Sequence, residues 1–299
     1  MAKSASESKV KLGNRRVTGK EQFYTPPETA KEIFDVLKTL VPDLKKHPFL
    51  EPAGGTGSFI AAAQQAGIKD VESWDIEPHH PLVKLGSFLD QHLSLKGAIT
   101  VTNPPFGRCN SLSIPFFNHA AKYSDLIVFI VPRSWRKWSV QNKLDRRFHL
   151  IRDDDLDINY VDENGEQAYA KNNLRTCIQY WKRSDTSIRS LYGVTDMKVI
   201  IKCKFDEADV SLTCFGYSCG TVKTDFPRKP NTTQMFLKLN HPKALEALQN
   251  VDFSRFYRNT AYTEALSIVE VNYLLNEYIF GDPKMKVPEN DELPLDDVD

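Results

Sequence analysis

The sequence predicts an α/β protein whose main domain is a doubly wound, mostly parallel sheet. Short apolar segments alternate with helical patterns over residues 21–184, as expected when strands are connected by helices. A glycine-rich turn follows the first apolar segment, at residues 54–57. The strand expected at 125–131 is continuously apolar after Asp125, which is typical of a parallel strand buried on both faces.

The first half of this domain supplies its elements in a regular order. A helix is expected over 28–40, directly after Pro26 and Pro27. An apolar strand at 49–53 runs into the glycine turn, and the small and apolar residues of 58–66 favour a helix. The β-branched and aromatic residues of 71–76 and 98–102 predict two further strands.

The second half continues the alternation and then changes direction. A helix at 114–123 precedes the strand at 125–131, and a basic helix is expected at 140–148. Strands are expected at 159–162 and 174–181, with a turn at Asp162–Gly165. A hairpin there would give the sheet an antiparallel edge.

Residues 185–285 differ in pattern and predict a smaller α+β target-recognition or accessory region. Period-two alternation at 199–205 and 210–217 indicates strands, while 241–249 and 267–279 have helical patterns. The ends carry opposite charge, with a basic arm at 1–20 and an acidic tail at 286–299. Both have few large apolar side chains, which predicts flexible segments.

Composition excludes some classes of protein. Lys+Arg and Asp+Glu each total 39 of 299 residues, so a protein that is basic throughout is excluded but a locally basic cleft is not. The longest apolar run, 126–131, is far shorter than the roughly 20 residues that span a bilayer. No signal-like segment opens the chain, so we expect a cytoplasmic protein without a membrane partner. The five cysteines form no CxxC pair, so we expect reduced thiols and no metal site.

Two motifs carry the chemistry. In Glu51-Pro-Ala-Gly-Gly-Thr-Gly57, Gly55 and Gly57 would let a ligand approach the backbone, and Asp75 follows at the end of the next strand. An acidic residue there can accept hydrogen bonds from both hydroxyls of a ribose. The spacing differs from GxGxxG, which favours a ligand with an amino-acid end over a pyrophosphate.

The second motif, Asn103-Pro104-Pro105-Phe106, directly follows the strand at 98–102. The prolines restrict the backbone and keep Asn103 out of the helical region. The Asn103 side-chain oxygen and the Pro104 carbonyl would then form two adjacent acceptors, which suit an exocyclic amino group. Phe106 offers a flat face on which a base could stack. The alternative is a rigid loop with Phe106 in the core.

With these motifs in this order, the chain resembles the S-adenosylmethionine-dependent N6-adenine DNA methyltransferases of the γ arrangement, over roughly residues 20–183. The family's upstream cofactor motif is matched by Gln22-Phe-Tyr-Thr-Pro-Pro27. The resemblance implies a Rossmann-like class I methyltransferase sheet and an enzyme of phage or bacterial type. It implies adenine-specific transfer of a methyl group from S-adenosylmethionine to duplex DNA, by base flipping and without a covalent intermediate.

The resemblance also implies roles for individual residues. Asn103, Pro104, Pro105 and Phe106 would form the catalytic motif, and the cofactor would be bound by Phe23, Tyr24, Thr25, Glu51, Gly55, Gly57, Asp75, Ile76, Phe88 and Asn103. The family's next motif usually places an acidic residue against the cofactor's adenine amino group. Here Ser87 stands where Asp is usual, so either Ser87 or Asp90 takes that role.

Basic residues interleaved with tryptophan suggest where a nucleic acid binds. The loop after the strand at 125–131 carries Arg133, Trp135, Arg136 and Lys137, which suit phosphate contacts and stacking. The alternative is a solvated loop with its tryptophans packed inward. Arg228 and Lys229 form another basic loop, in the second region.

Three other functions use related features. An RNA methyltransferase acting on adenine N6 or guanine N2 carries the same Asn-Pro-Pro-Phe motif, and a protein glutamine methyltransferase carries a similar one. A catalytically silent nucleic-acid-binding relative would be expected to lose Asn103, Gly55, Gly57 or Asp75, and all four are present. The sequence favours DNA methylation, and it decides neither the recognised bases nor the oligomeric state.

Overall fold

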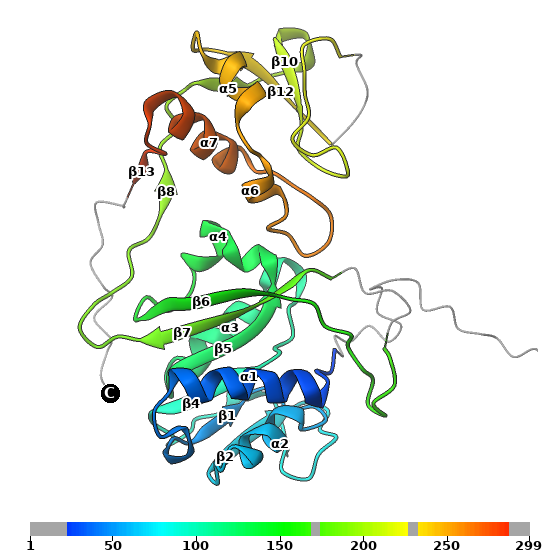
Figure 1. Ribbon diagram of the computed structural model, residues 1–299, viewed down its shortest axis with the longest axis vertical. Coiled ribbons are helices and arrows are strands. Elements are labelled where there is room, and N and C mark those ends of the chain that lie inside the picture. Colours follow the sequence, from blue (N-terminus) through cyan, green and yellow to red (C-terminus); the bar gives the residue numbers. More distant parts are fainter. Residues whose placement is uncertain (1–22, 169–173, 227–232, 287–299) are drawn as a thin grey trace, which may run out of the picture. The chain divides into compact units, whose positions relative to one another are not determined.

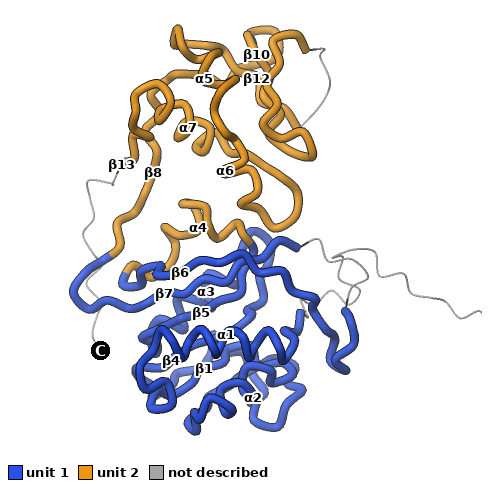
Figure 2. Tube along the Cα trace, viewed as in Figure 1, with its two compact units in different colours: residues 1–132, 147–188 blue, residues 133–146, 189–299 orange. Residues whose placement is uncertain are grey.

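The computed structural model describes residues 23–168, 174–226 and 233–286. The chain forms two compact units, which are coloured separately in Figure 2. The first comprises 1–132 and 147–188, and the second comprises 133–146 and 189–299. The predicted basic arm, and the predicted acidic tail from residue 287 on, lie outside the described residues.

The first unit is built on a seven-stranded sheet in the order β3-β2-β1-β4-β5-β7-β6. Its strands are β1 (Phe49–Glu51), β2 (Val71–Asp75), β3 (Lys84–Leu85), β4 (Ala98–Thr102), β5 (Ser124–Pro132), β6 (Phe148–Leu156) and β7 (Thr176–Arg183). The five strands β1 to β5 are parallel, while β7 runs antiparallel to both β5 and β6. The predicted doubly wound α/β sheet with an antiparallel edge hairpin is confirmed.

Helices cover both faces of this sheet (Figure 1). They are α1 (Pro27–Leu40), α2 (Ser58–Gln65) and α3 (Ser113–Ala120), with short 3₁₀ turns at Leu44–Lys46, Phe88–Asp90 and Arg108–Asn110. The helix α1 buries one apolar stripe, and its Phe34 ring packs edge-on against Phe49 of β1 at 5.6 Å. Because the chain moves in opposite directions along the sheet from β1 to β2 and from β4 to β5, right-handed crossovers place α2 and α3 on opposite faces.

That reversal of direction creates a switch point between β1 and β4, where ligands bind in sheets of this kind. The two strands pair in parallel with Phe49 opposite Ile99 and Leu50 opposite Thr100. Their carboxyl ends therefore lie side by side. The glycine turn follows β1 and the Asn103 loop follows β4, so the register alone makes the two motifs neighbours.

Two predicted elements of this region are wrong. The helix expected at 140–148 is only α4 (Trp138–Gln141), followed by turns, because Phe148 begins β6 and pairs with Arg183 of β7. The strand expected at 159–162 is reduced to isolated bridges at Val161. The strand β6 was not predicted, because its aspartates at 153–155 have low β propensity and pairing with β7 overrides it.

The second unit contains a four-stranded antiparallel sheet in the order β11-β10-β12-β9. Its elements are η4 (Arg133–Arg136), α4, β8 (Gly193–Val194), β9 (Ile200–Lys202), η5 (Phe205–Glu207), β10 (Val210–Thr213), β11 (Val222–Lys223), β12 (Gln234–Leu239), α5 (Ala244–Asn250), α6 (Ser254–Tyr257), α7 (Ile268–Phe280) and β13 (Met285–Lys286). One apolar cluster, which includes Leu212, Leu237 and Leu275, is its core. A capping box between Ser267 and Glu270 begins α7, and Gly281 in the left-handed region ends it.

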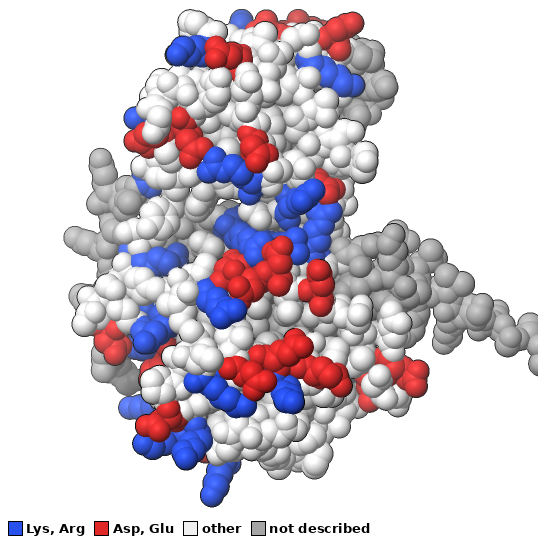
Figure 3. Space-filling model, viewed as in Figure 1, with Lys and Arg blue, Asp and Glu red and all other residues white. Residues whose placement is uncertain are grey.

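Over the described ranges, every helix is too short or too polar to cross a bilayer. Lys and Arg are interspersed with Asp and Glu over the face drawn in Figure 3, in keeping with the zero formal net charge.

We predict that Phe117→Ala destabilises the first unit by about 3–5 kcal/mol, the usual loss when a buried phenylalanine is truncated. The Phe117 side chain is fully buried, and the rings of Phe129, Phe148 and Trp181 each lie 5.6 Å from it. Urea unfolding monitored by tryptophan fluorescence measures the change. The control is Ile151→Ala, since Ile151 is 46% exposed on β6. A loss below about 1 kcal/mol for Phe117→Ala would contradict this view of the core.

Candidate active site

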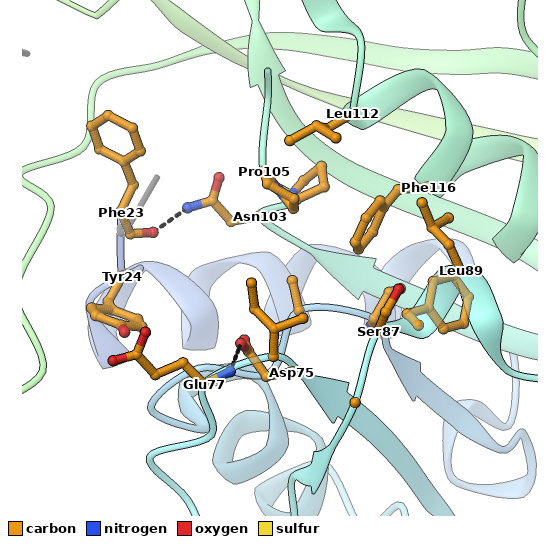
Figure 4. A pocket seen from close by; sticks show the side chains of 16 residues that line it. Phe23, Tyr24, Asp75, Glu77, Ser87, Leu89, Asn103, Pro105, Leu112 and Phe116 are labelled. Atoms are coloured by element: carbon orange, nitrogen blue, oxygen red, sulfur yellow. Dashed lines mark hydrogen bonds between the residues drawn. The ribbon is translucent and has the colours of Figure 1, made fainter. Parts of the chain in front are cut away.

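A cavity of about 390 Å³ opens at the carboxyl ends of the strands in the first unit. Its size lies within the range of about 300–1,000 Å³ that is typical of small-molecule pockets. The walls come from residues 23–24, 52–53, 75–77, 86–89 and 103–105, together with Leu112 and Phe116 (Figure 4). The predicted donor and catalytic motifs thus meet at one cavity. The walls contributed by Leu112 and Phe116 were not predicted, although α3 follows the Asn103 loop directly.

The glycine turn lies next to one wall of this cavity. Gly55 and Gly57 both have positive φ, +45° and +81°, and the Gly55 N–H donates to Asp75 Oδ2 at 2.8 Å. A Cβ atom at Gly55 would lie 2.7 Å from the Tyr24 ring, and one at Gly57 would lie 2.5 Å from His80. Tyr24 and His80 therefore cover the turn, and Pro52 and Ala53 form the cavity wall beside it.

Asp75 is held rigidly at the end of β2. Its Oδ1 accepts the Glu77 N–H at 2.8 Å while its Oδ2 accepts the Gly55 N–H, and the carboxylate lines the cavity. Burial raises the pKa of Asp75, and the two backbone hydrogen bonds oppose that shift. Because a carboxylate has about four acceptor positions, both oxygens can still accept hydrogen bonds from a ligand.

Asn103 presents a buried acceptor at the opposite wall. Its Nδ2 donates to the carbonyl of Phe23 at 2.6 Å, as Figure 4 shows, which assigns the orientation of the amide. Its Oδ1 atom is buried and accepts no hydrogen bond from any residue that the structure describes. An unmade hydrogen bond of this kind is costly, and a donor group brought to this oxygen would offset that cost.

Phe106 does not lie as the sequence suggested. Its ring is only 6% exposed and stacks on Phe23, with ring centroids 6.0 Å apart and planes at 25°. The Tyr160 ring also packs against Phe23, with ring centroids 5.3 Å apart. The face of Phe106 that was expected to receive a base is therefore covered by Phe23. Tyr160 was missed because it stands outside every motif.

Glu51 and Thr25 are buried and do not line the cavity. Glu51 Oε1 accepts hydrogen bonds from Thr102 Oγ1 at 2.5 Å and from the Ala53 N–H at 3.2 Å. Its Oε2 has no partner within the described ranges, and burial raises the pKa of Glu51 well above its usual value. Glu51 therefore ties the end of β1 to the end of β4 beneath the cavity.

The other end of the cavity is apolar. Phe88 is buried there, with its ring edge-on to His119 at 4.7 Å, and Ile76 lies 69% exposed at the rim. Ser87 lines this end, whereas Asp90 is exposed and does not reach it. Of the two residues expected to contact the adenine amino group of the cofactor, only Ser87 therefore faces the cavity.

The residues expected to bind nucleic acid belong to the second unit and divide into four groups. Trp135 is fully buried, which favours the alternative of tryptophans packed inward over stacking on a base. Lys137 Nζ pairs with Glu270 Oε1 at 3.1 Å, so its charge is already compensated. Arg133 and Arg136 are half-buried, and Arg228 and Lys229 lie outside the described residues. Within the described ranges, no group of His, Cys, Asp and Glu could hold a metal ion.

Comparisons with known proteins give weak similarities. No family model and no curated protein matches the chain. Solved structures that resemble it include a proposed RNA methyltransferase from Pyrococcus horikoshii, with 18% identity, TM-score 0.45, and coverage of 59% of this chain and 94% of that one.

Two others belong to type I restriction enzymes. The M protein of EcoKI has 16% identity and TM-score 0.41, covering 56% of this chain and 45% of that one. A modification subunit of a proposed type I restriction enzyme from Vibrio vulnificus YJ016 has 13% identity and TM-score 0.43, covering 83% of this chain and 59% of that one. The strand order and pairing of this chain define its fold class independently of these similarities.

The buried Glu51 makes stability depend on pH. Because its folded-state pKa is raised, the stability it contributes is present below about pH 4.5, its ordinary pKa, and is lost as the pH rises through the raised value. We predict that Glu51→Gln removes this loss, so the melting temperature of the variant relative to wild type should increase from pH 4 to pH 9. Glu32→Gln, at an exposed position of α1, controls for net charge. A difference between Glu51→Gln and wild type that is independent of pH would contradict the assignment.

Proposed function

We propose that the first unit is an S-adenosylmethionine-dependent methyltransferase that acts on the N6 amino group of adenine in DNA. The observation that carries the proposal is the buried, unpartnered Oδ1 of Asn103 at the wall of the cavity that also contains Asp75. The two groups suit different parts of one reaction. Asp75 suits the ribose of a nucleoside donor, and Asn103 suits the amino group that receives the methyl.

The lining of the cavity fits such a donor. Asp75 would accept both ribose hydroxyls, while Ile76 and Phe88 would pack on the two faces of the purine. Tyr24, whose ring packs over the glycine turn, would flank the amino-acid end. Glu51, Gly55, Gly57 and Thr25 would act through the shape of this wall, since they do not line the cavity. The bound donor supplies an electrophilic methyl group.

The Asn103 loop would activate the acceptor. The lone pair of an aromatic amino group is delocalised into the ring, so the nitrogen is a weak nucleophile. Asn103 Oδ1 and the Pro104 carbonyl would each accept one N–H and localise the lone pair on nitrogen. The Phe23 carbonyl holds the amide in this orientation before substrate arrives. Catalysis would then depend on positioning and preorganised polar groups rather than on a covalent intermediate.

An adenine inside a duplex must be turned out of the stack to reach this site, at a cost of a few kcal/mol. The stacked pair of Phe23 and Phe106 lies beside Asn103, whose Nδ2 donates to the Phe23 carbonyl. A base could stack on the pair, or Phe23 could move aside and expose Phe106. RNA methylation at adenine N6 or guanine N2 would use the same acceptors, so the choice of nucleic acid is decided by experiment.

The first experiment measures labelled-methyl transfer to duplex DNA, single-stranded DNA, RNA and a glutamine peptide in parallel. We expect incorporation into DNA as N6-methyladenine. Asn103→Ala should reduce transfer by at least about 10²-fold, because preorganised acceptors act mainly in the transition state. Binding of S-adenosylmethionine, measured by calorimetry, should remain within a few-fold of wild type.

The result has clear alternatives. Incorporation into RNA or peptide alone would replace DNA as the substrate. Wild-type transfer by Asn103→Ala would remove Asn103 from the catalytic role. Absence of both binding and transfer in the wild type would make the chain a silent relative.

Asp75 should make donor binding depend on pH. Because burial raises the pKa of Asp75, its carboxylate becomes protonated at a higher pH than usual, and protonation removes an acceptor for the ribose. We predict that affinity for S-adenosylhomocysteine falls as the pH is lowered through this raised pKa. Asp75→Ala should bind at least about tenfold more weakly, with less pH dependence.

Calorimetry over a series of pH values, from neutral down to the lowest pH at which the protein stays folded, measures both effects. The matched control is Glu72→Gln, because Glu72 lies on the same strand but pairs with Lys84 away from the cavity. Unchanged affinity of Asp75→Ala would refute the ribose role.

A further inference from the structure

The apolar end of the cavity contains one hydroxyl group, that of Ser87. Four other residues that line the cavity, Phe88, Leu89, Leu112 and Phe116, are apolar, and Figure 4 shows Ser87 on the side away from Tyr24 and Glu77. The Ser87 carbonyl accepts a hydrogen bond from Gln91 Nε2 at 2.9 Å, but the Ser87 hydroxyl makes no hydrogen bond within the described residues. Ser87 is therefore the polar side chain that a flat ring would meet at this end.

The position of Asp75 orients a nucleoside in the cavity. Asp75 is the last residue of β2, and Ser87 comes just after β3, the neighbouring strand at the edge of the sheet. A ribose held by Asp75 would direct its base toward the apolar end, because the other walls carry Tyr24, Glu77 and Asn103. The rim of the base would then meet the Ser87 hydroxyl.

We infer that Ser87 determines how the site discriminates at the six-position of the donor's purine, and that it makes the site tolerant there. This inference rests on the proposed function. A carboxylate at this point only accepts hydrogen bonds, so it would favour a six-amino purine and repel a six-oxo purine. A hydroxyl both donates and accepts, so it can pair with either group. The exposed Asp90 does not reach the cavity and cannot restore the selection.

The test compares two product analogues by calorimetry, S-adenosylhomocysteine and S-inosylhomocysteine, which differ at the six-position and at the adjoining ring nitrogen. The readout is the ratio of their affinities in each variant, so the contribution of the ring nitrogen cancels between variants. We expect Ser87→Asp to raise the preference for the adenosyl compound at least tenfold over wild type. Ser87→Ala should weaken both compounds by a similar factor, of less than about tenfold, since a neutral hydrogen bond contributes about 0.5–1.5 kcal/mol.

Asp90→Asn is the matched control and should leave the ratio unchanged. Melting temperatures identify any variant that fails to fold, and Ser87→Ala, which removes one oxygen atom, still tests the inference if Ser87→Asp does not fold. An unchanged ratio in folded Ser87→Asp, or a loss confined to the adenosyl compound in Ser87→Ala, would overturn the inference alone. Failure of the wild type to bind either compound would instead overturn the proposed function.

Discussion

The chemistry proposed for this protein depends on one hydrogen bond, from Asn103 Nδ2 to the carbonyl of Phe23. An asparagine amide can turn either its oxygen or its nitrogen toward a cavity, and only the oxygen can accept a hydrogen bond from an amino group. The Phe23 carbonyl accepts a hydrogen bond from the amide nitrogen, and the amide oxygen is left buried without a partner among the described residues. Eighty positions separate the two residues in the chain, so only folding brings them together.

This arrangement is held by the ends of the strands beneath it. Glu51 connects the ends of β1 and β4 through Thr102, and the Gly55 N–H connects the turn to Asp75 on β2. The segment with Phe23 and Tyr24 is bound in turn by a bridge between Tyr24 and Val161. A displacement of any of these strand ends would change the shape of the cavity, because these hydrogen bonds position the residues that line it or lie next to it.

The sequence predicted the parts of the fold that depend on local pattern. The apolar run of β5 and the β-branched residues of β4 identified these strands, and the Pro26–Pro27 pair marked the beginning of α1. Elements that depend on distant pairing were missed. The strand β6 contains three consecutive aspartates and exists because β7 pairs with it, while the basic segment after α4 has a helical pattern but folds as turns.

The candidate site divides in the same way. The sequence by itself determined that a glycine turn, a strand-end aspartate and an Asn-Pro-Pro-Phe loop follow three strands, because these residue types and spacings are local properties of the chain. Tertiary structure alone decided that Phe23 covers Phe106, that Glu51 lies beneath the cavity, and that Ser87 rather than Asp90 faces it. The physical reason is that side-chain direction and burial depend on contacts between segments far apart in the chain, which local pattern does not encode.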